Sequence, residues 1–281
     1  MVPRFSHSIS LPMTMSTWHR GRGRATGHVR SVSLPCQSHP LIANLQDQIG
    51  TVRSSAASAD ASLAWIQTGL SQIQLLMSAV NDFLHLSESK TVLQHATSST
   101  ECLLENFLYL IDSYSSLLSD IVTLMQHQFE VQSALRRHDS ALLASSLKSQ
   151  RRIEKNLNHL MVSLRTAGKC PSLLLASNVQ ETEIFEVLKE AIGATSAASV
   201  VLFNRVVAMS SAASTSADSS VLYTINPFKK KISNEEIEKL IYVKFEELEE
   251  CVRIVESGSE RVLRTLVNNR VALLNIQSNS F

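Results

Sequence analysis

Residues 245–278 read FEELEECVRIVESGSERVLRTLVNNRVALLNIQS, and this stretch decides the fold of the chain. Its apolar residues recur at steps of three and four, which places them on one face of an α-helix. Only Ser259 and Asn269 interrupt the seam. The stretch therefore predicts one long helix, either a coiled coil or the closing helix of a bundle. The seam comprises Ile241, Phe245, Leu248, Val252, Val255, Val262, Leu266, Leu273 and Ile276.

The same spacing recurs along most of the preceding chain, at 63–84, 103–135 and 143–164, and an apolar segment follows from about 178 to 210. No segment shows the strict alternation typical of a strand. The predicted fold is all-α, an elongated helical bundle with a C-terminal coiled-coil-like helix. We expect the seams at 103–135, 143–164 and 241–276 to pack against one another. The residues expected in that core are Phe107, Leu110, Leu117, Ile121, Leu248, Val255 and Leu266.

Composition divides the chain into a tail and a bundle domain. Residues 1–37 are rich in arginine and serine, and the first acidic residue of the chain is Asp47. Such a segment cannot bury a core, so we expect a disordered basic tail followed by a helical bundle at 38–278. The small-residue run SSAASTSADSS, residues 210–220, predicts a flexible connection over about 211–232 before the last helix. The acid-poor tail is also typical of a transit peptide, so a chloroplast location is the alternative to the favoured cytoplasm.

Charge and composition narrow the classes of partner. A formal net charge of +1 and 5% aromatic residues give no general attraction to nucleic acid and no stacking surface for single strands. The apolar run at 191–210 is interrupted by Arg205 and contains many small polar residues, so we expect no integral membrane span. The four cysteines are widely separated, which favours reduced, buried thiols.

The chain resembles the plant BYPASS-like family. The similarity is carried by HVRSVSLPCQSHP at 28–40, QSALRRHDS at 132–140 and the stretch 245–278, and it extends over about residues 28–278. The resemblance implies a helical, plant-specific protein with a role in root and shoot development. It implies no catalytic residues, so none are transferred to this chain.

The residues themselves give no enzymatic motif. There is no phosphate-binding glycine loop, no HExxH zinc motif and no GxSxG nucleophile motif. The segment HQFE at 127–130 brings one histidine and one glutamate together, but a helical di-iron site needs paired motifs on facing helices. We therefore predict a protein that is not an enzyme and that uses no metal or other cofactor.

Basic residues are concentrated on two helices. Arg136, Arg137 and His138 end one predicted helix, where positive charge favours the helix dipole. The residues Lys148, Arg151, Arg152 and Lys155 lie on the polar side of the next helix. The basic faces of these two helices support an alternative function, that of a peripheral membrane or trafficking adaptor.

The segment RSVSLP, residues 30–35, carries the one site that the sequence predicts. Arg30 lies three residues before Ser33, Pro35 lies two residues after it, and Ser31 lies between. Arginine at this spacing suits a basophilic kinase, and a phosphate on Ser33 suits an arginine-lined pocket. The pattern resembles a docking motif for 14-3-3 proteins. The alternative is that the two prolines only shape the approach to the first helix.

Together these features predict a regulatory or scaffold protein that acts through protein partners. Phosphorylation of the RSVSLP segment would control it, and self-association through the C-terminal helix is a further option.

Overall fold

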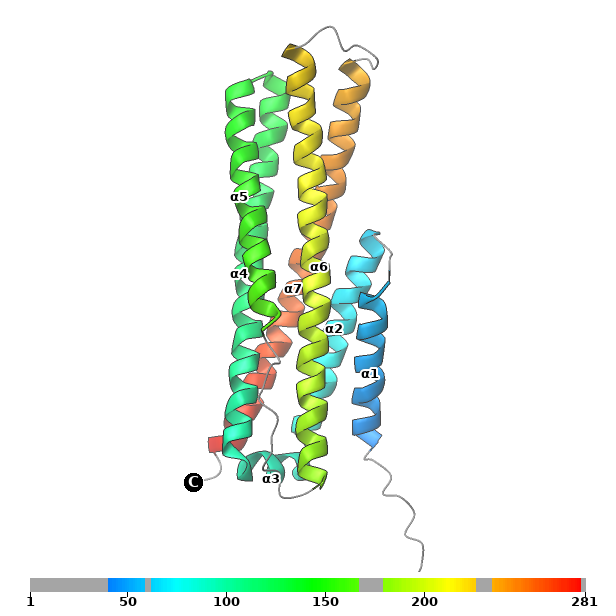
Figure 1. Cartoon of the computed structure of the whole chain (residues 1–281), viewed down its shortest axis with the longest axis vertical. Helices are drawn as coiled ribbons and strands as arrows, with labels where there is room; N and C mark the ends of the chain where they lie inside the picture. The colour runs from blue at the N-terminus through cyan, green and yellow to red at the C-terminus, as the bar shows by residue number, and fades with distance from the viewer. Residues whose placement is uncertain (1–39, 59–61, 167–178, 226–233, 279–281) are drawn as a thin grey trace, which may run out of the picture. The chain divides into compact units, whose positions relative to one another are not determined.

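The structure is a computed structural model that describes residues 40–58, 62–166, 179–225 and 234–278. These residues belong to one compact unit, Ser38–Phe281. Within them the chain forms seven helices and no strand, which confirms the all-α fold (Figure 1). The helices are α1 (Pro40–Ala56), α2 (Leu63–Leu84), α3 (Ser87–His95), α4 (Thr97–Arg137), α5 (Ser140–Leu164), α6 (Val179–Ile225) and α7 (Asn234–Ser278).

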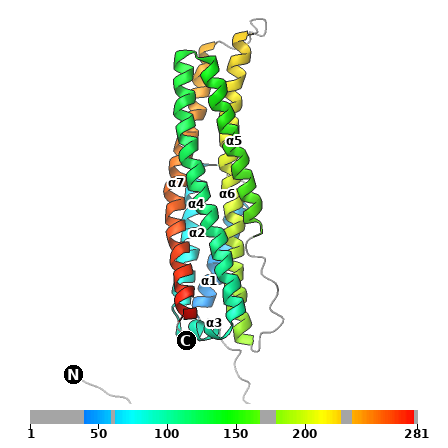
Figure 2. The same cartoon turned by 90° about the vertical axis from the view of Figure 1, so that its left-hand side faces the viewer.

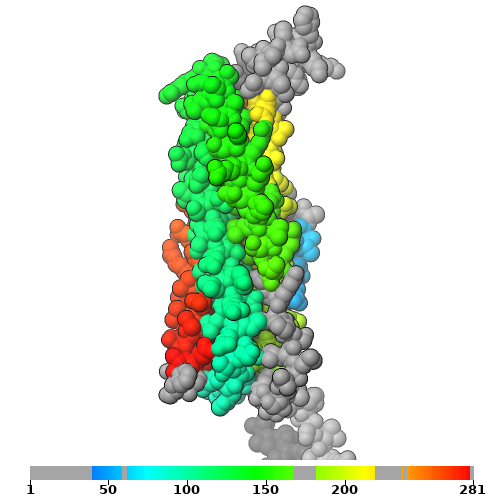
Figure 3. All heavy atoms as spheres, turned by 60° about the vertical axis from the view of Figure 1, so that its left-hand side comes forward, coloured from blue at the N-terminus to red at the C-terminus, as the bar shows by residue number. Residues whose placement is uncertain are grey.

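Helix α4 lies between two of its predicted partners. It packs along α5 on one side and along α7 on the other (Figure 2). The space-filling view shows α4 flanked by α5 and by the C-terminal part of α7 (Figure 3). Helices α5 and α7 make no contact with each other within the described residues, so the expectation that all three seams meet is wrong for this pair. Helix α6 packs on both α5 and α7 and closes the bundle.

The predicted core is confirmed. All seven residues expected there are buried, each with 2% or less of its surface exposed. Tyr114 is wholly buried, its hydroxyl lies 2.7 Å from Ser199 Oγ, and its ring meets Phe203 edge-on with centroids 5.5 Å apart. Since α7 packs on α2, α4 and α6 of its own chain, it is the closing helix of a bundle.

Helix α6 corrects the prediction of a flexible connection at 211–232. It continues without a break to Ile225, and only residues 226–232 of that range lie outside the described residues. Ser210, Ala213, Ser214 and Ala217 are buried at helical spacing. Alanine is the best helix former, and small side chains allow neighbouring helices to approach closely, so this composition supports a packed helix here.

Two short features also differ from expectation. Helix α3, which joins α2 to α4, is absent from the sequence prediction, because nine residues with two buried positions give a weak periodic signal. Cys102 is disulfide-bonded, whereas four reduced thiols were expected, and Cys251 is a buried free thiol. Wide spacing along a sequence does not determine which cysteines meet in the fold.

Among the residues that the structure describes, one helix is long and apolar enough to cross a membrane by length and composition alone. It is Thr182–Asp218, within α6, and half of its most apolar window is buried inside the bundle. The core helix of a folded domain passes the same test, and α6 packs against α1, α2, α4, α5 and α7.

Candidate functional site

The docking motif predicted from the sequence lies outside the described residues. This applies to all four of its members, Arg30, Ser31, Ser33 and Pro35, and to the predicted tail as a whole. The site that the structure does describe lies elsewhere, on α2, α6 and α7.

The histidine and glutamate of the HQFE segment join two helices. His127 Nδ1 lies 3.0 Å from a carboxylate oxygen of Glu130, and Ser146 of α5 donates a hydrogen bond to the same oxygen at 3.2 Å. These bonds, the one from His127 above all, lower the pKa of Glu130. The bond from Ser146 makes the pair part of the contact between α4 and α5. Within the described residues no group of three potential metal ligands occurs.

The basic residues of α5 have divided roles. Arg151 forms an ion pair with Asp218 of α6, so it helps to hold these two helices together. Lys148, Arg152 and Lys155 are exposed. At the end of α4, His138 adopts a left-handed conformation with φ of 53°, which stops the helix before Asp139 caps α5.

A groove forms because α2 begins partway along the bundle. Helices α6 and α7 continue past the start of α2, so among the described residues no further helix continues α2 along this side of the pair (Figure 1). A cavity of about 430 Å³ occupies this position. We call it the α6–α7 groove; its lining residues are Ser62 and Leu63 of α2, Arg205, Ala208, Met209 and Ala212 of α6, and Lys244 and Glu247 of α7.

Each wall of the groove is one face of a helix. On α6, the residues 205, 208, 209 and 212 follow the i, i+3, i+4, i+7 spacing of a single face. On α7, residues 244 and 247 share a face with 240 and 243, which lie one turn farther along the groove. Leu240 and Val243 are 56% and 48% exposed. Exposed apolar side chains at helical spacing beside a cavity are typical of a binding surface.

The charged residues that line the groove come from both walls. Arg205 belongs to α6, and Lys244 and Glu247 belong to α7, where the Glu247 carboxylate lies 2.8 Å from Lys244 Nζ. The first turn of α2 adds the positive end of a helix dipole at the base of the groove. There Ser62 caps the helix by accepting a hydrogen bond from the backbone N–H of Trp65 at 3.1 Å.

Cys251 lies one turn beyond Glu247 on α7 and is wholly buried. Burial raises the pKa of its thiol to about 12, and the positive charge of Arg205 opposes that shift only in part. The thiol therefore stays protonated at neutral pH, which removes its nucleophilic form.

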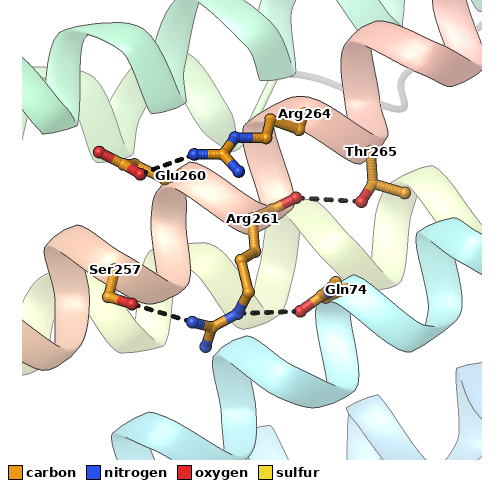
Figure 4. Close-up of polar contacts among 6 residues, drawn as sticks. All are labelled: Gln74, Ser257, Glu260, Arg261, Arg264 and Thr265. Atoms are coloured by element: carbon orange, nitrogen blue, oxygen red, sulfur yellow. Dashed lines mark hydrogen bonds and ion pairs between the residues drawn. The ribbon is translucent and has the colours of Figure 1, made fainter.

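Contacts between α2 and α7 set the position of the groove. Arg261 of α7 donates a hydrogen bond to the side-chain oxygen of Gln74 at 3.1 Å, and Ser257 holds the same guanidinium at 2.9 Å (Figure 4). Gly258 brings the two backbones close, since an added Cβ would lie 2.6 Å from Leu70 Cδ1. These contacts fix how far along α7 the first turn of α2 lies, and hence where the groove begins.

The groove is not predicted by the sequence pattern. Leu240 and Val243 were the available signal, because they are apolar residues outside the seam of α7. Whether they lie beside a groove depends on where α2 begins relative to α6 and α7, which is a tertiary property.

Comparison with known proteins places the whole bundle in a family. No curated protein and no solved structure matches the chain. The family model described as Protein BPS1 matches residues 69–276 of the 281, from within α2 to near the end of α7. The match includes the α6 and α7 walls of the groove. The chain belongs to the BPS1 family, the BYPASS family.

Proposed function

We propose that this protein is a non-enzymatic regulatory or scaffold protein that acts through protein partners in root and shoot development. Membership of the BPS1 family fits a role in plant development. The proposal adds the mode of action, which is recognition of other proteins by the bundle surface.

The observation that supports this proposal is the exposed apolar face of α7 beside the α6–α7 groove. Leu240 and Val243 expose about half of their surface, although the seam residues of the same helix, such as Phe245 and Leu248, are wholly buried. Exposed apolar clusters mark interaction sites in proteins. The thiol of Cys251, one turn beyond Glu247 on α7, stays protonated and is therefore a poor nucleophile.

The regulatory part of the proposal concerns the RSVSLP segment. Phosphorylation of Ser33 by a basophilic kinase recruited through Arg30 would create a docking site for a 14-3-3 protein, with Ser31 and Pro35 completing the motif. The phosphate adds about −1.5 to −2 charges and three acceptor oxygens, which an arginine-lined pocket recognises. The carboxylate of an aspartate lacks this array of three oxygens, so an aspartate at position 33 should not replace the phosphate.

A peptide of residues 28–40 tests the regulatory part directly. The form phosphorylated on Ser33 should bind a purified 14-3-3 protein, and the unphosphorylated form should bind far more weakly. In plant extract, Ser33→Ala should abolish capture of the full chain, and Ser33→Asp should not restore it. Equal capture of the parent and Ser33→Ala proteins, with Ser33 phosphorylated in the parent, would refute the switch.

Proximity labelling in plant cells tests the proposed mode of action. A labelling enzyme fused to the C-terminus should mark a small, reproducible set of proteins in developing roots and shoots. The matched control is the same fusion carrying Leu117→Asp, which places a charge in the core and should lose that set. Identical labelling by both fusions would count against partner binding by the folded bundle.

A further inference from the structure

We propose that Ser140, the first residue of α5, is a phosphorylation site for a serine kinase that recognises arginine on the amino-terminal side of its target. Arg137 is the residue that this kinase recognises, and ATP supplies the phosphate. The site goes beyond the proposed function, which assigns a modification to the RSVSLP segment and none to the helical bundle.

The spacing between arginine and serine distinguishes Ser140 from the other hydroxyl side chains. Arg137 lies three residues before Ser140, and Arg136 adds a second positive charge one residue earlier. Arg30 and Ser33 have the same spacing in the RSVSLP segment. Among the residues that the structure describes, no other serine or threonine has an arginine or lysine three residues before it. A kinase that selects by this spacing therefore finds one target in the described bundle.

The chain around Ser140 is exposed. Residues 136–141 run from the last turn of α4 into the first turn of α5, and every one of them is exposed; we call this segment the α4–α5 turn. It lies at one end of the hairpin that α4 and α5 form (Figure 1). The nearest buried residues on either side are Ala134 and Leu143. A kinase can therefore reach the serine hydroxyl and both arginines without displacing a core side chain.

Few interactions hold the α4–α5 turn in its folded conformation. The backbone already leaves helical geometry here, because His138 is left-handed and Asp139 is extended. The Asp139 N–H donates to the carbonyl oxygen of Ala134 at 3.0 Å, and Asp139 Oδ1 accepts from the N–H groups of Ala141 and Leu142 at 3.1 and 3.0 Å. Segments with exposed backbone hydrogen bonds and few buried contacts open most readily, so this one can enter the active site of a kinase.

The reaction is a phosphoryl transfer from ATP. Ser140 Oγ attacks the γ-phosphorus, and a new oxygen–phosphorus bond forms while the bond from that phosphorus to the β–γ bridging oxygen breaks. ADP leaves, and the proton of the serine hydroxyl passes to the catalytic aspartate of the kinase. The products are phosphoserine and ADP, and the kinase supplies its own magnesium ions.

The phosphate reverses the charge of the α4–α5 turn. Two arginines and one aspartate, Asp139, give these six residues a formal charge of +1 when His138 is neutral. Phosphoserine adds about −1.5 to −2 charges at neutral pH. A surface that attracts anions thus becomes one that repels them, so phosphorylation weakens any contact of this turn with an acidic surface.

Ser87 is the matched control within the chain. It is exposed and is the first residue of a helix, α3, as Ser140 is of α5, but Leu84 lies three residues before it. The position at the start of a helix is therefore common to both serines. Only the arginine three residues earlier distinguishes Ser140.

Phosphorylation of the purified full chain by a recombinant calcium-dependent protein kinase, of the kind that requires a basic residue three positions before serine, tests the proposal. Site-resolved mass spectrometry should find phosphate on Ser140 and none on Ser87. Arg137→Ala should lower the initial rate at Ser140 about tenfold, because one charge-assisted contact is lost. Arg152→Ala, at an exposed position of α5 away from the turn, should leave the rate unchanged. Absence of phosphate from Ser140, or equal rates for Arg137→Ala and the parent, would overturn the proposal.

Arg136→Ala separates recognition from a disturbance of the turn. It removes a positive charge from the same end of α4 but keeps arginine three residues before Ser140. It should therefore lower the rate by less than Arg137→Ala does, and circular dichroism melting should show that both variants are folded. Equal losses in the two variants would show that the kinase responds to general charge and not to the spacing, which contradicts the proposal.

Plant tissue provides the second test. Tagged chain recovered from developing roots in the presence of phosphatase inhibitors should carry phosphate on Ser140, and Arg137→Ala chain expressed at the same level should carry several-fold less. Absence of phosphate from Ser140 in roots and shoots would overturn the proposal. Phosphate on Ser33 and captured partners are scored in the same samples, so failure at Ser140 can be distinguished from failure of the proposed function.

Discussion

Asn269 of α7 donates a hydrogen bond from Nδ2 to the backbone carbonyl oxygen of Met77 in α2, at 2.9 Å, and both residues are wholly buried. Asn269 is one of the two residues that interrupt the apolar seam of α7. Its bond joins residues 192 positions apart in the chain. A polar side chain in an otherwise apolar seam can fix the register of two helices, and here it ties α7 to α2.

Asn269→Leu should therefore change stability little, whereas Asn269→Asp should reduce it strongly. The Oδ1 atom of Asn269 is buried without a hydrogen-bond partner in the described structure, so leucine removes an unsatisfied group as well as a bond. We expect a change of about 1 kcal/mol or less for leucine, and a loss of about 3 kcal/mol or more for an unpaired buried carboxylate. Urea unfolding measures both. Asn268→Asp, on the exposed face one residue earlier, should stay within about 0.5 kcal/mol of the parent.

Leu117→Asp tests the central position of α4. Leu117 is wholly buried, so an aspartate there would be a charge without a partner, and we expect a loss of several kcal/mol. Ser116→Asp is the control, because Ser116 is exposed on the same helix turn. Thermal melts that show similar midpoints for the two variants would contradict the assignment of this seam to the core.

Removing the hydroxyl of Tyr114 and removing that of Ser199 should reduce the stability of the protein by different amounts, although each change breaks the same hydrogen bond. Ser199 Oγ also donates to the carbonyl oxygen of Thr195 at 2.8 Å, so Tyr114→Phe leaves the serine satisfied and should cost about 1 kcal/mol. Ser199→Ala leaves the phenol hydroxyl of Tyr114 buried without this partner and should cost about 1–3 kcal/mol. Chemical denaturation of both single variants gives the comparison. A larger loss for Tyr114→Phe than for Ser199→Ala would contradict the geometry.

Gly258 and Gly50 form a matched pair of helical glycines. An alanine Cβ at 258 would lie 2.6 Å from Leu70 Cδ1 and 3.0 Å from Leu70 Cβ, so Gly258→Ala should separate α7 from α2 and destabilise the fold. At Gly50 nothing lies within 4 Å of the added atom, so Gly50→Ala should stabilise the protein by about 0.5–1 kcal/mol through helix propensity. Opposite shifts in melting temperature are expected. A stabilising effect at 258 would show that the helices are not in close contact there.

Glu154 should make the bundle less stable as pH rises. Burial raises the pKa of its carboxyl above the ordinary value, and the hydrogen bond from Ser210 at 2.7 Å opposes this in part. Between the unfolded and the folded pKa the native state therefore binds more protons than the unfolded chain, and stability falls as pH increases through that window. Glu154→Gln should stabilise the protein at pH 7, and the gain should disappear below the ordinary carboxyl pKa. Denaturant unfolding at pH 4 and pH 7 measures the difference, with Glu105→Gln on the exposed face of α4 as the control. A gain that is larger at pH 4 would have the wrong sign.

The sequence predicted the helices and their buried faces because helical periodicity is a local property. Leu117 and Leu248 recur at steps that place them on the seams of α4 and α7, and both are buried. The sequence pattern wrongly predicted that the small-residue segment at 210–220 begins a flexible connection. Ala213 and Ala217 are typical of a linker by composition, but packing in α6 makes them core residues.

The candidate site depended on features that periodicity does not contain. The α6–α7 groove exists because α2 starts at Leu63, far along the length of α6 and α7, and contacts such as Arg261–Gln74 hold it there. Axial offsets between helices follow from tertiary packing, so neither the groove nor the presence of both Arg205 and Lys244 in its lining could be predicted from one helix at a time. The RSVSLP motif, in contrast, can be read from the sequence alone because it is a local pattern. Its residues lie outside the described part of the structure.

Partner binding itself is tested most directly by the native mass of the protein in plant tissue. A tagged chain expressed at its normal level should be recovered from developing root tips in a complex larger than its own 31.0 kDa mass, with at least one other protein in constant proportion. An Ala212→Trp variant, whose new side chain would fill the α6–α7 groove, should shift it toward the mass of the free chain. Recovery of the parent protein alone, or only with copies of itself, at every stage of root and shoot growth would contradict the account.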